Sequence, residues 1–189
     1  MIVNYQKTTN KMEIKAKTRT EGVLKIMHFL AWLAFIGFMI KAGAILVSYG
    51  VSCVKPEAAK NLYLGLNLHG LSQFSFWHYT LSVFLLVAIL GMKAFAFFLA
   101  IKILMKVNLV NPFTIEVAGI IQRIGYVLLA TWFMAMAANA HTDWLLKTTG
   151  QLYGDWVETE FIFMAGLMFI ISQVFKRGVE IQSENDLTV

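Results

Sequence analysis

The stretch WHYTLSVFLLVAILGMKAFAFFLAIKI, from Trp77 to Ile103, decides the fold of this chain. It is almost wholly apolar, and its charged residues are Lys93 and Lys102. A helix needs ~20 mostly apolar residues, rising ~1.5 Å each, to cross ~30 Å of hydrocarbon. The stretch therefore predicts a membrane-spanning helix.

Three further stretches meet the same criterion, and the whole composition agrees with them. The chain of 189 residues is 58% hydrophobic and 14% charged, whereas soluble domains are about one quarter charged. We therefore predict an all-α membrane protein, a four-transmembrane-helix bundle that forms one domain over residues 1–189. The predicted spans are about 23–47, 77–103, 117–140 and 157–175. The polar start of the chain and the length of the first span are not those of a cleavable signal peptide.

The basic residues predict the orientation, because lysine and arginine collect on the cytoplasmic side of a membrane. One side of the predicted membrane holds only Lys55, Lys60 and Lys147. The opposite side, which is therefore the predicted cytoplasmic side, holds Lys7, Lys11, Lys15, Lys17, Arg19, Lys25, Lys102, Lys106, Arg123, Lys176 and Arg177. Residues 1–22 are then a basic cytoplasmic segment and 176–189 a cytoplasmic tail.

The outer connection before Trp77 is longer than a simple turn requires. Leucines at 62, 64, 66 and 68 alternate with other residues, and a period of two favours an extended strand with one apolar face. Such a strand must pair its backbone, so we predict a small extracytoplasmic cap that joins the two outer loops. The alternative is a short helix lying in the membrane interface.

Two lysines, Lys41 and Lys93, fall within predicted spans, where a central charge costs ~2.5–3.5 kcal/mol. Snorkelling of the flexible stems toward the headgroups is the favoured interpretation. The alternative is an ion pair of Lys41 with Glu158 or Glu160, which enter the fourth span from the outer side.

The sequence contains no recognisable catalytic motif. Cys53 is the single cysteine, which excludes an internal disulfide and a multi-cysteine metal site. The spacings of His69, His78 and His141 match no compact zinc motif, so we interpret them as interfacial polar residues. We therefore predict no enzyme activity, no cofactor and no metal.

Two cytoplasmic segments carry residues suited to a partner. The inner connection contains Asn111-Pro112-Phe113-Thr114. There Asn111 or Thr114 can cap a helix, Pro112 suits its first turn, and Glu116 would face the positive end of its dipole. The tail turns from basic to acidic and ends in apolar residues. A short solvated extension is the favoured interpretation, and the alternative is a docking peptide for a basic partner. The tail residues concerned are Glu180, Glu184, Asp186, Leu187 and Val189.

The chain resembles the bacterial membrane family called domain of unknown function 2975, over nearly its whole length. The resemblance rests on Leu62 to Leu68, on Asn111 to Thr114 and, most specifically, on the ending from Glu180 to Val189. It implies four membrane helices in the bacterial inner membrane and no established activity. Members are often encoded beside a very small helix-turn-helix regulator, which implies, by analogy, a membrane partner that holds or releases a transcription factor.

The leading hypothesis is therefore a regulatory or sequestering membrane partner of a small cytosolic DNA-binding protein. The chain itself is not expected to bind nucleic acid, and it could form a homo-oligomer. The runner-up is a small transporter or permeability factor that uses Lys41 and Lys93.

Overall fold

The computed structural model describes residues 2–107, 112–151, 153 and 160–186, with side chains described between Thr20 and Glu184. Its long helices are α1 (Ile2–Val54), α3 (Phe76–Lys106), α4 (Ile115–Thr149) and α5 (Glu160–Asp186). Two short helices, η1 (Pro56–Lys60) and α2 (His69–Phe74), connect α1 to α3. No strand occurs in the described residues.

Four helical segments are long and apolar enough to cross a membrane, which confirms the predicted fold class. They are Thr20–Val54, Phe76–Lys106, Ile115–Thr149 and Glu160–Glu184. The predicted basic segment at the start of the chain is helical from Ile2 and continues into the first of these segments without a break.

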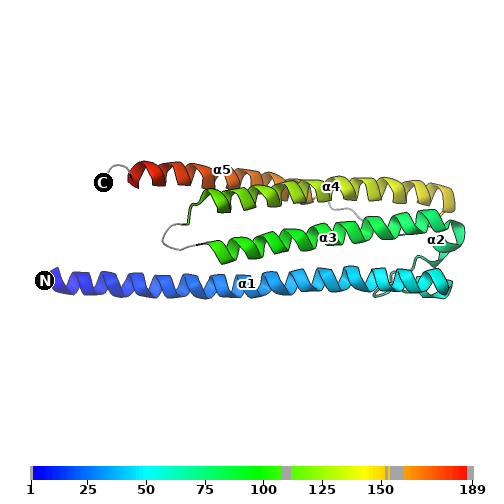
Figure 1. Cartoon of the computed structure of the whole chain (residues 1–189), viewed down its shortest axis with the longest axis horizontal. Coiled ribbons are helices and arrows are strands. Elements are labelled where there is room, and N and C mark those ends of the chain that lie inside the picture. The colour runs from blue at the N-terminus through cyan, green and yellow to red at the C-terminus, as the bar shows by residue number, and fades with distance from the viewer. Residues whose placement is uncertain (1, 108–111, 152, 154–159, 187–189) are drawn as a thin grey trace.

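The four long helices pack side by side in the order α1, α3, α4, α5 (Figure 1). Within the described residues, the backbone of α1 approaches that of α3 but neither α4 nor α5. Both ends of the chain lie at the end of the molecule where α3 is connected to α4 (Figure 1). We call this the terminal end, and the opposite end the cap end.

Helix α5 is displaced along α4 toward the terminal end. The Ser172 hydroxyl donates to the Ala118 carbonyl at 3.1 Å, and the Ala165 carbonyl lies against Gly125. This antiparallel register places the start of α5 level with the middle of α4 and carries the end of α5 beyond the start of α4 (Figure 1).

The cap end contains the largest apolar core, and the predicted cap is present there. Leu62, Leu68 and Leu71 of the first outer connection are buried with Ile45 of α1 and Tyr79 of α3. The second outer connection joins them, because the ring of Tyr153 is part of the same core. Gly70 also lies directly against the side chains of Gln151 and Tyr153.

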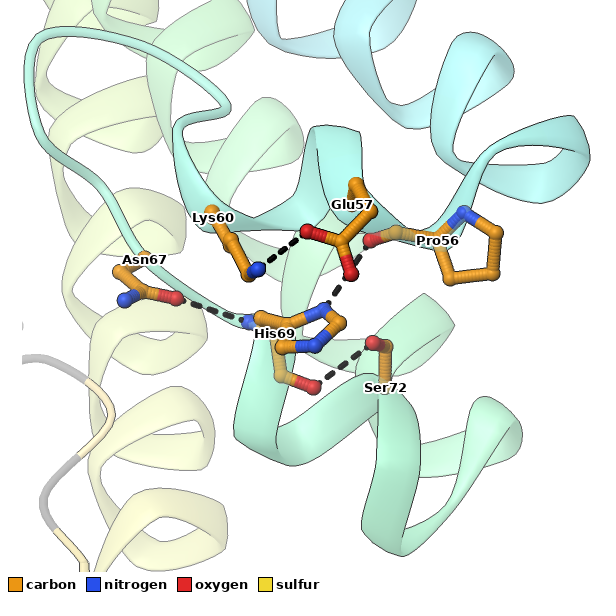
Figure 2. Close-up of polar contacts among 6 residues, drawn as sticks. All are labelled: Pro56, Glu57, Lys60, Asn67, His69 and Ser72. Atoms are coloured by element: carbon orange, nitrogen blue, oxygen red, sulfur yellow. Dashed lines mark hydrogen bonds and ion pairs between the residues drawn. The ribbon is translucent and has the colours of Figure 1, made fainter.

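Polar contacts close the cap around His69 (Figure 2). The Nδ1 atom of His69 lies 3.1 Å from the Pro56 carbonyl oxygen, and its backbone N–H donates to Asn67 Oδ1 at 3.0 Å. Because a carbonyl only accepts, Nδ1 carries the proton. Lys60 pairs with Glu57, and this neighbour lowers the pKa of the Glu57 carboxyl.

The predicted strand at Leu62–Leu68 is wrong, because the chain reverses at its centre. Leu64 and Gly65 have φ angles of +44° and +88°, values that a strand does not contain. The backbone N–H of Leu62 donates to the Leu66 carbonyl, and Gly65 donates to the Asn61 side chain. The single apolar face that the period of two predicted is absent, because Leu62 and Leu68 enter the core while Leu64, at the tip, is 87% exposed.

Candidate docking site at the terminal end

The inner connection and the tail, both predicted to bind a partner, lie against each other at the terminal end. The ring of Phe113 packs edge to face on Phe175 of α5, with centroids 5.2 Å apart. A Cβ atom placed on Gly178 would lie 2.6 Å from the Phe113 ring. A side chain at Gly178 would therefore displace Phe113, so this glycine allows the turn to seat on α5.

Two polar contacts hold α5 in the register that brings these segments together. One is the buried hydrogen bond from Ser172 to the Ala118 carbonyl. The other runs from Lys176 Nζ to Gln122 Oε1 at 3.0 Å. A side chain that bonds a backbone carbonyl of another helix is favourable in lipid, where water cannot compete.

The tail continues α5 as an acidic helical end. Arg177 donates to Glu180 at 2.6 Å, and Glu180 and Glu184, one helical turn apart, are both exposed. Side chains four residues apart lie on the same face of a helix. The tail therefore presents two carboxylates on one face, one of them partnered by Arg177.

The other predicted docking residues are distributed as follows. Pro112 precedes α4 instead of standing in its first turn, and Thr114 caps the helix by accepting from the Val117 N–H at 3.2 Å. Glu116 lies in the first turn of α4, as predicted, but pairs with Lys106 of α3. Asp186 ends α5. Asn111, Leu187 and Val189 lie outside the described residues.

Of the two predicted ion pairs of Lys41, the one with Glu160 is not formed. Lys41 lines a cavity of about 330 Å³ beneath the cap turn at Tyr63–Leu66. Glu160 is on α5, which does not approach α1, and Glu158 lies outside the described residues. Lys93 is the lysine that reaches the start of α5, with Nζ 5.2 Å from the centroid of the Phe161 ring.

One contact at the cap end could not be found from sequence spacing. His78 Nδ1 lies 3.1 Å from His141 Nε2, and Trp144 packs on the His78 ring at 4.8 Å between centroids. His78 is in the first turn of α3 and His141 is in the last third of α4, so only the antiparallel pairing of these helices brings them together. Within the described residues, no three potential metal ligands cluster.

These features define a helical multi-pass membrane protein whose cap end is closed by two connections and whose terminal end carries an acidic helix. The chain belongs to the family described as protein of unknown function (DUF2975), whose model matches residues 54–189. The match begins at the last residue of α1, so it covers the cap, α3, α4 and α5. No curated protein and no solved structure matches the chain.

Proposed function

We propose that this membrane protein docks a small, basic, cytosolic DNA-binding protein at its terminal end and so controls its access to DNA. The observation that carries the proposal is the contact of Phe113 with Phe175 and Gly178. It joins the inner connection to the root of the acidic tail, so two segments distant in sequence form one surface.

The charges of this surface fit a basic partner. Glu180 and Glu184 are exposed, and they follow Gly178, which already lies level with Phe113 before the start of α4. Ile181 between them is 47% exposed, which adds an apolar contact to the acidic face. Opposite charges steer two proteins together and select against wrong partners. A DNA-binding domain carries the required basic surface, and its binding to carboxylates would compete with its binding to phosphates.

The family supports the same class of partner by analogy. The resemblance implies that a small helix-turn-helix regulator is often encoded beside a member of this family. The membrane-spanning helices cannot themselves contact DNA. A regulatory role would therefore act by holding the DNA-binding protein at the membrane or releasing it. The cytoplasmic orientation that the basic residues predict is required for this role.

The test is a pull-down of the full-length protein from its native host in mild detergent, with the captured proteins identified by mass spectrometry. We compare the intact chain with a version that ends at Arg177 and with the variant Glu180→Gln/Glu184→Gln. The variant Glu21→Gln is the control. Glu21 is exposed on α1 near the same end, so its loss controls for a general change in charge.

We expect the intact chain and Glu21→Gln to recover one small basic DNA-binding protein, and the shortened chain to lose it. With purified partner, the double variant should bind about tenfold more weakly, because each exposed charge pair contributes up to about 1 kcal/mol. Recovery of the same proteins by the intact and shortened chains would refute docking at the tail.

A further inference from the structure

A second site lies at the terminal end, between α3 and α4 and apart from the acidic tail. It is a cavity of about 660 Å³ at the point where α3 ends and α4 begins. Its wall combines charged side chains with apolar ones, which is unusual for a surface that faces hydrocarbon alone. Its lining includes Lys102, Met105, Lys106, Ile115, Gly119 and Arg123.

The charged part of the wall is predominantly basic. Glu116 also lines the cavity, but it pairs with Lys106. Lys102 lies over the Phe98 ring at 4.6 Å from its centroid. Arg123 is exposed and makes no hydrogen bond or ion pair within the part of the chain that the structure describes. A guanidinium and an ammonium group therefore face the cavity without a carboxylate of their own.

The apolar part of the wall continues from these charges toward the bilayer centre. Leu99 closes the back of the cavity, and Phe98 and Phe95, whose rings stack, follow Lys102 along α3, with Phe95 49% exposed. Met105 and Ile115, 69% and 66% exposed, lie at the mouth of the cavity, nearer the terminal end. A Cβ atom on Gly119 would meet nothing within 4 Å. The missing side chain at Gly119 therefore leaves space in the wall between the basic groups and the apolar surface.

We propose that this cavity binds an anionic phospholipid of the leaflet at the terminal end. Arg123 and Lys102 would hold the phosphate, since arginine pairs with phosphate oxygens through two parallel hydrogen bonds. An acyl chain would run from Lys102 toward the bilayer centre along Phe98 and Phe95. Basic pockets between membrane helices on the cytoplasmic side are suited to anionic headgroups, and the apolar wall favours a lipid over a soluble phosphate.

The test is native mass spectrometry of the full chain in mild detergent, titrated with phosphatidylglycerol or with phosphatidylcholine. Arg123→Gln removes a cavity charge, and Lys25→Gln removes an exposed charge from α1 near the same end. Gly119→Leu fills the cavity without altering any charge. Inorganic phosphate is added in a further arm to identify a site for a soluble anion.

We expect phosphatidylglycerol to be retained in preference to phosphatidylcholine. Arg123→Gln should weaken its binding about fivefold, Gly119→Leu should weaken it at least as much, and Lys25→Gln should leave it unchanged. Equal retention of both lipids, an unaffected Gly119→Leu variant, or an equal loss in Lys25→Gln would overturn the proposal. Displacement of the lipid by millimolar inorganic phosphate would also overturn it, in favour of a soluble-anion site.

Discussion

At the scale of single residues, hydroxyl groups buried between helices determine how the cap end packs. Ser52 Oγ donates to the Tyr49 carbonyl at 2.7 Å and lies 2.6 Å from the Tyr79 hydroxyl. A serine has one hydroxyl proton, so Tyr79 must be the donor to Ser52. Tyr79 is 1% exposed and Ser52 is 6% exposed, so neither hydroxyl can replace this hydrogen bond by one to water.

The direction of this hydrogen bond predicts unequal costs for removing its two partners. Ser52→Ala leaves the buried Tyr79 donor without an acceptor and should cost about 1–3 kcal/mol of unfolding free energy. Tyr79→Phe removes the donor itself and should cost about 1 kcal/mol. The double variant should be more stable than Ser52→Ala alone, as measured by equilibrium unfolding in detergent. An equal cost for the two single changes would contradict the assigned direction.

The conformation of the turn at Leu64 and Gly65 and the surroundings of Lys41 could not be predicted from the sequence. The alternation of Leu62 to Leu68 correctly predicted that Leu62 and Leu68 are buried, but it wrongly placed Leu64 on the same face, because Leu64 is at the exposed tip of a turn. The positive φ angles of Leu64 and Gly65 distinguish this turn from a strand, and a leucine rarely adopts such a conformation. The separation of Lys41 from Glu160 could not be predicted, because it depends on which helices are neighbours.

At the scale of helices, length and hydropathy were sufficient to predict the four long helices, because ~20 consecutive apolar residues have few other uses. The sequence did not predict the displacement of α5 along α4. It depends on the close approach at Gly125, where a Cβ atom would lie 3.4 Å from the Phe169 ring. It also depends on the hydrogen bond of Ser172 to the Ala118 carbonyl. Small residues permit such contacts in many registers, and the sequence does not select one.

The helix contact at Gly125 predicts the effect of enlarging it. Gly125→Val would force its methyl groups into Phe169 and should destabilise the packing of α5 on α4 by about 1–3 kcal/mol. Gly91→Val is the matched control, because a Cβ atom on Gly91 of α3 meets nothing within 4 Å. Thermal unfolding in detergent should show a lower midpoint for Gly125→Val than for Gly91→Val. Equal midpoints would mean that α5 does not depend on this contact.

At the scale of the whole molecule, the order α1, α3, α4, α5 places the two predicted docking segments together and keeps Lys41 apart from Glu160. Charge counting predicted that both termini face the same side, and the two ends do lie at one end of the molecule (Figure 1). The docking proposal requires that this end face the cytoplasm. Pairing between non-adjacent segments, such as Phe113 with Gly178, became visible only in three dimensions.

The most direct test of this orientation uses the single cysteine of the chain. Cys53 is exposed at the cap end, so the unmodified protein reports on that end. The variant Cys53→Ser/Ser183→Cys moves the thiol to the tail, where Ser183 is exposed. A membrane-impermeant maleimide is applied to intact spheroplasts and to permeabilised ones. We predict that Cys53 is labelled in intact spheroplasts, and that the tail cysteine is labelled only after permeabilisation. Labelling of the tail cysteine in intact spheroplasts would contradict a cytoplasmic docking end.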